Sequence, residues 1–140
     1  MTDLEQEVAD CYRGYHNAFV QAGKTQDATL LRPFTHIPLM TVAGGQASVI
    51  ESEEKSDARW SRILANLPAD YDHSVAHSLD VTMISTTSAL VTVDVSRFKK
   101  DGKDYDHFCA SYVMVKTEEG WRLTTWLVHD SVDALRTSRL

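Results

Sequence analysis

The chain of 140 residues has little cysteine, little proline and no long apolar run, and each shortage excludes a class of protein. Its 2 cysteines, Cys11 and Cys109, lie in apolar-periodic segments, so they form neither a disulfide framework nor a closely spaced redox motif. We expect buried thiols in a reducing compartment. The N-terminus is acidic, without an apolar signal core, and no segment approaches the length that spans a membrane. The sequence therefore predicts a cytoplasmic protein without a membrane partner.

Basic residues are also scarce. The chain has 14 Lys and Arg residues against 20 Asp and Glu residues, which gives a net charge of −6. Lys99 and Lys100 are followed at once by Asp101, so no basic stripe forms, and nucleic acid is not an expected partner. A hydrophobic content of 43% at this length supports one buried core and is too little for two ordinary domains. We expect residues 1–140 to form a single domain.

Several catalytic motifs are absent from the sequence. It has no G-x-S-x-G, no Gly-rich phosphate loop and no H-E-x-x-H, so serine hydrolase, nucleotide-dependent and zincin chemistry have no support. His107 and Cys109 share one face of a predicted strand, and with His129 they could in principle ligate a metal. Because no second tight ligand pair accompanies them, we predict neither a metal nor another cofactor.

Helical patterns occupy three segments. The capping-box spacing of Thr2 and Glu5 begins the first, and Ala22 and Gly23 end it. Residues 27–32 predict a short helix stopped by Pro33. A third helix begins at Ser52 and ends at Pro68. The apolar stripe of the first helix is Leu4, Val8, Cys11, Tyr12, Tyr15 and Phe19, and that of the third is Trp60, Ile63, Leu64 and Leu67.

Strand patterns fill the remainder. Residues 36–42 and 46–50 predict a hairpin around Gly44 and Gly45. Four longer strands are predicted at residues 75–85, 89–98, 105–116 and 121–129. In the second of these, valines alternate with polar residues, which is typical of a sheet with one buried face. Residues 130–140 predict a short tail with a few helical residues.

Three short motifs carry a family resemblance: Phe34-Thr35-His36 before the first strand, Asp101-Gly102 in a hairpin, and Gly120-Trp121-Arg122-Leu123 at the last strand. Their order over residues 4–130 resembles the nuclear transport factor 2-like superfamily, and its SnoaL-like branch in particular. The resemblance implies a cystatin-like α+β fold, in which a cone-shaped, curved antiparallel sheet wraps around three helices and leaves a cavity at its wide end. The superfamily includes isomerases, cyclases, dehydratases and hydrolases but also non-catalytic association domains, so the fold does not decide the function.

Ketosteroid isomerases within this superfamily offer a specific test. Their chemistry needs a carboxylate base and an oxyanion hole made of a tyrosine and a protonated acid. Here Val42 falls near the position of the base and Ser111 near that of the second acid. Only Tyr15 lies near the third element. The sequence therefore does not support that reaction.

Three residues are the predicted catalytic groups: His36, Tyr15 and Asp94. The resemblance places His36 at the mouth of the cavity, where an imidazole can act as acid or base; the alternative is a hydrogen bond to a loop carbonyl. Tyr15 extends a hydroxyl into the cavity or serves as a core residue. Asp94 is a natural base if its face lines the cavity, and a solubilising residue if that face meets solvent.

Aromatic residues supply the predicted ligand-binding surface. The predicted ligand-binding residues are Tyr12, Phe19, Trp60, Tyr112 and Trp126. Simple core filling is the alternative for all five. His16 lies off the main stripe of its helix. Arg97 lies on the face opposite Asp94, where it either anchors an anionic substrate or braces the hairpin.

Together these patterns predict a small-molecule-binding pocket protein with a mainly apolar ligand, acting without a cofactor as an isomerase, cyclase, dehydratase or hydrolase. The alternative is a non-catalytic dimerisation or accessory module. An open cavity lined by converging polar groups favours the first, and a closed apolar core favours the second. We also predict a homodimer that pairs through the outer sheet face. The residues expected on that face are Thr82, Thr92, Thr124 and Trp126.

Overall fold

Helix α1 (Asp3–Thr25) begins where the capping box predicts. The side chain of Thr2 accepts a hydrogen bond from the backbone N–H of Glu5, which satisfies a donor of the first turn. The helix continues past its expected end and stops at Gln26, which adopts the left-handed conformation at φ 59°. The computed structural model describes residues 1–129 and residue 138, so the predicted tail otherwise lies outside the described residues.

The other two helices are shorter. The η1 segment (Ala28–Phe34) is a 3₁₀ helix that includes Pro33, so the expected stop at this proline is wrong. Pro33 has no N–H to donate, but the last turn of η1 is closed by the N–H of Thr35, which donates to the carbonyl of Arg32. Helix α2 (Glu53–Ala65) begins after Ser52, whose side chain accepts a hydrogen bond from the N–H of Lys55.

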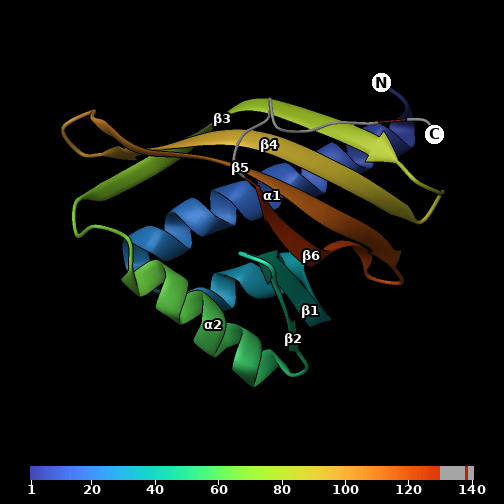
Figure 1. Ribbon diagram of the computed structural model, residues 1–140, viewed down its shortest axis with the longest axis horizontal. Helices are drawn as coiled ribbons and strands as arrows, with labels where there is room; N and C mark the ends of the chain where they lie inside the picture. Colours follow the sequence, from blue (N-terminus) through green and yellow to red (C-terminus); the bar gives the residue numbers. More distant parts are fainter. Residues whose placement is uncertain (130–137, 139–140) are drawn as a thin grey trace.

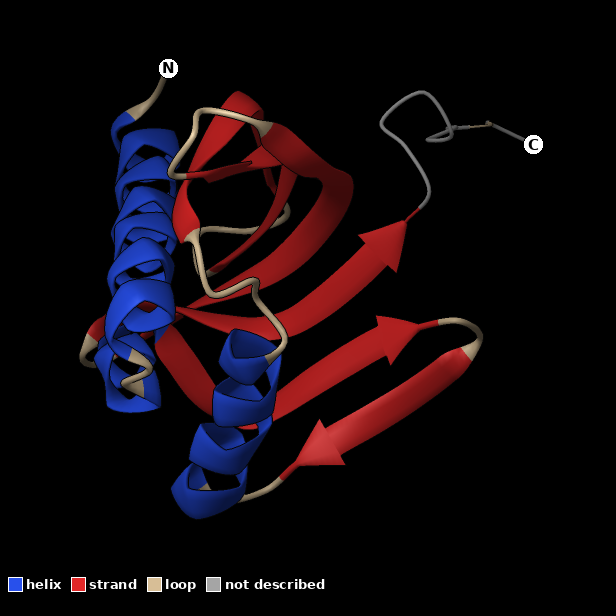
Figure 2. Ribbon diagram, turned by 90° about the vertical axis from the view of Figure 1, so that its left-hand side faces the viewer, coloured by secondary structure: helices blue, strands red, loops and turns tan. Residues whose placement is uncertain are grey.

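Six strands form one curved sheet around these helices. They are β1 (Thr35–Ala43), β2 (Gln46–Ile50), β3 (Tyr71–Met83), β4 (Ser88–Lys99), β5 (Asp104–Thr117) and β6 (Gly120–His129). The spatial order is β2-β1-β6-β5-β4-β3, and all neighbours are antiparallel except β1 and β6. Helix α1 lies along the inner side of the sheet, and α2 lies beside β1 and η1 (Figures 1 and 2). The predicted α+β fold is confirmed.

Side-chain alternation gives the sheet an inner and an outer face. Val91, Val93 and Val95 of β4 are buried in the core, as their alternation predicts. On β5 the inner row includes Ala110, Tyr112 and Met114. The intervening residues face outward, away from α1. Asp94 therefore belongs to the outer face.

Several bulges interrupt the alternation, and two of them lie within the long strands. One is at His77 in β3 and the other at Thr124 in β6, where Val113 pairs with Thr125 but Met114 pairs with Leu123. The extra residue shifts the parity of β6, so Trp126 joins the same inner face as Leu123. The placement of Trp126 on the outer face is therefore wrong. The prediction assumes that side chains alternate without interruption along the whole strand, and such a pattern does not reveal where a bulge inserts an extra residue.

The outer face carries a polar network over β3, β4, β5 and β6. Ser111 interacts with Thr92 at 3.0 Å and with His129 at 3.3 Å. His77 interacts with Ser96 at 2.8 Å. His107 is hydrogen-bonded to Asp94. The homodimer through this face stays a prediction, now without Trp126 as a contact.

Candidate functional site

The inner face of the sheet and α1 enclose a small aromatic cavity. Its volume is about 20 Å³, which is room for about one water molecule. Four of the five predicted ligand-binding residues line it, together with the predicted catalytic Tyr15. The lining residues are Tyr12, Tyr15, His16, Phe19, Ser74, Val95, Arg97, Phe108, Tyr112 and Trp126. The cavity thus combines the small size expected of an accessory module with the polar groups expected of a binding site.

The tyrosines form the rigid part of the wall. The ring of Tyr112 lies 5.6 Å from the ring of Tyr12 and 5.6 Å from that of Tyr15. The rings of Tyr12 and Tyr15 lie 5.9 Å apart, so the three tyrosines form one cluster. Burial raises the pKa of all three tyrosines, so their hydroxyls stay protonated at neutral pH and can donate hydrogen bonds.

Two indole rings stack behind this wall. Trp60, the remaining predicted ligand-binding residue, is 2% exposed and packs on Trp126 at 5.7 Å and an interplanar angle of 8°. The Nε1 donors of both rings are buried and have no hydrogen-bond acceptor among the described residues. Trp121 differs, because its Nε1 donates to the Glu7 carboxylate at 3.0 Å. Buried donors in folded proteins almost always have a partner, so the two indoles are exceptional.

Arg97 supplies a charged group to the cavity lining. Its guanidinium carbon lies 4.6 Å from the ring centroid of Phe108 and 5.3 Å from that of Phe19. Nη1 donates to the carboxylate of Asp106 at 3.2 Å. Nε is buried without an acceptor among the described residues. Arg97 thus braces β4 against β5, one of the two roles that the sequence left open, and it also lines the cavity.

His16 is the imidazole of this lining. Its Nε2 donates to the backbone carbonyl of Ser74 at 2.9 Å, which leaves Nδ1 as the acceptor in the neutral ring. The Ser74 hydroxyl interacts in turn with the Tyr71 hydroxyl at 2.7 Å. His16 lies off the apolar stripe of its helix, so little in the sequence indicates that it lines a cavity. In the structure β3 packs against that side of α1.

His36 lies elsewhere. It lines a shallow depression of about 370 Å³ with Glu119, Arg122 and neighbouring residues, and none of these lines the aromatic cavity. Its Nδ1 bonds to the carbonyl of Pro38 at 3.2 Å, the alternative that the sequence left open. Asp94 is on the outer face. The three predicted catalytic residues are therefore not brought together.

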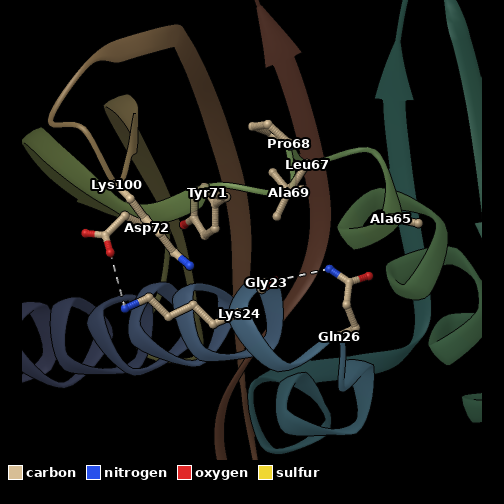
Figure 3. A pocket seen from close by; sticks show the side chains of 10 residues that line it. All are labelled: Gly23, Lys24, Gln26, Ala65, Leu67, Pro68, Ala69, Tyr71, Asp72 and Lys100. Atoms are coloured by element: carbon tan, nitrogen blue, oxygen red, sulfur yellow. Dashed lines mark hydrogen bonds and ion pairs between the residues drawn. The ribbon is translucent and has the colours of Figure 1, made fainter.

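A larger cleft opens where α1 and α2 end (Figure 3). Its volume is about 580 Å³. Lys24 and Asp72 form an ion pair of 3.8 Å across it, and Gln26 donates to the carbonyl of Gly23 at 3.1 Å. The side chains of Lys24 and Asp72 are 41% and 39% exposed, so water already satisfies these charges. The aromatic cavity, with its buried unpaired donors, is the stronger candidate site.

Over residues 1–129 and 138, no group of three or more His, Cys, Asp and Glu side chains is arranged to hold a metal ion. In the same part of the chain, no helix is both long and apolar enough to cross a bilayer.

The fold places the chain among the NTF2-like proteins, in which a curved sheet wraps around helices. Residues 6–131 match the family described as NTF2-like protein (DUF6841), and the chain belongs to this family. No curated protein matches the chain in sequence.

Solved structures show the same fold at low sequence identity. A Nostoc punctiforme protein of unknown function with a cystatin-like fold is 8% identical, with a TM-score of 0.71 over 91% of this chain and 92% of its own. A proposed ketosteroid isomerase from Shewanella frigidimarina is 12% identical, with a TM-score of 0.66 over 91% and 98%. A proposed dehydratase of the NTF2-like family from Streptomyces avermitilis is 18% identical, with a TM-score of 0.61 over 88% and 92%. At these identities the likeness shows the fold alone.

Proposed function

We propose that this chain binds a small, mainly apolar molecule in the aromatic cavity, and that the molecule presents hydrogen-bond acceptors to the protein. The proposal rests on four buried polar groups that have no partner among the described residues: Nε1 of Trp60, Nε1 of Trp126, Nε of Arg97 and the hydroxyl of Tyr105. Of these residues, Trp126 and Arg97 line the cavity. An unpaired buried donor costs about 1 to 3 kcal/mol. A ligand oxygen that pairs with one of them offsets that cost.

The ligand has to displace side chains, because the cavity volume is about 20 Å³. The tyrosines are buried at 2% to 5% exposure and are held by one another. Arg97, Phe108 and Trp126 are only partly buried, so they are the movable part of the wall. A molecule about as large as one substituted benzene ring fits this mode of entry.

Binding is better supported than catalysis. The ten lining residues include no carboxylate. Acid–base chemistry would rest on Nδ1 of His16 together with the Tyr15 hydroxyl, and a proton transfer needs both groups within hydrogen-bond reach of one substrate. The second candidate function is a non-catalytic accessory module, and the small volume of the cavity favours it.

The three tryptophans provide the test. In a ¹H–¹⁵N spectrum each indole N–H gives its own signal, assigned by single Trp→Phe variants. Acetophenone, which joins a benzene ring to a carbonyl acceptor, should shift the signals of Trp60 and Trp126. Trp121 is the internal control, because its donor is already bound to Glu7. Ethylbenzene, which has a similar shape without the acceptor, should shift them less.

The same spectra can reject the proposal. If acetophenone moves none of the three signals, or moves all three alike, the cavity does not bind a small molecule specifically. The accessory-module function then replaces the proposal.

A further inference from the structure

We infer that the ligand of the aromatic cavity is an organic monoanion whose carboxylate binds the Nε–Nη2 edge of Arg97. This inference rests on the proposed function and names the chemical class of the ligand. Its basis is the way the structure uses one part of the guanidinium and leaves the other part unused.

The guanidinium of Arg97 has one hydrogen bond. Nη1 donates to Asp106, which pairs directly across from Arg97 on β5. The Asp106 side chain is 42% exposed and that of Arg97 is 18% exposed, so this ion pair lies at the solvent end of the arginine. Nε is buried without an acceptor among the described residues, and the hydrogen bond to Asp106 is made by Nη1 rather than by Nη2. Nε and Nη2 form the side edge of the guanidinium, whose parallel N–H bonds match the two oxygens of a carboxylate.

The surroundings favour an ion pair at that edge. The rings of Phe19 and Phe108 lie against the guanidinium in place of water. A charge pair gains strength as the surroundings become less polar. None of the ten lining residues carries a carboxylate, and Asp106, which holds Nη1, lies outside this lining. The neighbouring tyrosine hydroxyls are donors.

The same features limit the ligand. Arg97 is the one Lys or Arg residue among the ten that line the cavity, and it already holds the carboxylate of Asp106, so the site favours a ligand with no more than one negative charge. The remaining walls are mostly aromatic rings, which contact an apolar or aromatic body. A benzoate-like molecule satisfies both limits, whereas a dianion such as a phosphate ester does not.

The experiment compares benzoate with benzamide, its neutral analogue of nearly equal shape, by titration of the whole chain followed through the indole signals. Benzoate should bind at least about tenfold more tightly than benzamide. Arg97→Gln should remove this preference, and Arg97→Lys should weaken benzoate binding because an ammonium lacks the two-pronged edge.

Asp106→Asn is the matched variant that leaves Arg97 in place. It removes the carboxylate that competes for the guanidinium, so benzoate should bind more tightly and benzamide should be unaffected. If Arg97 only braces β4 against β5, this substitution lowers the unfolding midpoint and leaves the benzoate preference unchanged. The wild-type comparison and this variant keep the test valid even if an Arg97 variant fails to fold.

Two failures are distinguishable. Equal affinity for benzoate and benzamide in the wild-type protein overturns the carboxylate assignment and leaves the proposed function standing. If neither compound nor acetophenone shifts the signals of Trp60 and Trp126, the proposed function fails and this inference fails with it.

Discussion

Trp60→Phe is expected to change the stability of the protein by no more than about 1 kcal/mol in either direction when no small molecule is bound. Replacement of a buried tryptophan normally destabilises a core. Trp60 is buried at 2% exposure, but its Nε1 donor has no acceptor among the described residues. The substitution therefore removes a group that is itself unfavourable in the core.

Three opposing effects of similar size decide the change in stability. The smaller ring leaves a void of roughly 40 Å³, which at about 24 cal/mol per Å³ costs about 1 kcal/mol. Removal of an unpaired buried donor returns about 1 to 3 kcal/mol. Weaker stacking on Trp126 offsets about 1 kcal/mol of that gain. The net change ranges from about 1 kcal/mol of destabilisation to about 1 kcal/mol of stabilisation.

Urea unfolding measures this difference directly. The protein is refolded from denaturant first, so that no small molecule is carried over from the cell. Trp121→Phe is the matched control: it leaves a similar void and also breaks the hydrogen bond to Glu7, so it should destabilise more than Trp60→Phe. Equal losses in the two variants would refute the reasoning, because they would mean that the Trp60 donor is satisfied within the protein.

Three other predictions follow from groups outside the cavity. Burial raises the pKa of Cys11 to about 11, so a thiol reagent at pH 8 should modify it about 100-fold more slowly in the folded than in the unfolded chain; equal rates would contradict this. Gly23→Ala places a Cβ 2.8 Å from the Tyr71 ring, and overpacking of about 1 to 3 kcal/mol should exceed a helix-propensity gain of at most about 1 kcal/mol; a higher urea midpoint would contradict this. The Asp94 carboxylate raises the pKa of His107 by hydrogen bonding, so its stabilising contribution should be complete below about pH 6.5 and lost as the pH rises through the folded-state value. Asp94→Asn should return the pKa of His107 towards its ordinary value, which an NMR titration of His107 measures. The loss of stability with rising pH should then disappear.

The helices and the inner rows of the sheet could be predicted because their signals are local. The capping box at Thr2 and the glycines of the first hairpin act over a few residues, and Gly44 and Gly45 indeed have positive φ angles of 57° and 77°. The valines of β4 follow a period that no bulge interrupts. The sequence predicts the third strand from residue 75, but β3 begins at Tyr71. That start has no local signal, because Tyr71 pairs with Lys99 at the far end of β4.

The residue types of the site could also be predicted, but their relative positions could not. Tyr15 and Tyr112 meet because α1 crosses the inner face of β5. His36 was expected at the cavity mouth, but the parallel pairing of β1 with β6 sets Thr35 beside Leu123, next to the β5–β6 turn. Arg97 and Asp94 lie on opposite faces, as the strand period requires. Which face lines a cavity is a property of the whole sheet.

The extra residue at Thr124 also bears on how this strand can vary in length. Val113 pairs with Thr125 and Met114 with Leu123, so the residue pairing with β5 skips Thr124, whose hydroxyl donates to the Val113 carbonyl at 3.2 Å. Its loss would turn β6 into a regular strand in which Leu123 and Trp126 still face inward, whereas loss of a paired residue nearer the β5–β6 turn would change the inward row. A relative that is one residue shorter at this point can therefore keep the same inward-facing residues. An alignment that places no gap at Thr124 would match Trp126 with a residue that faces solvent in that relative.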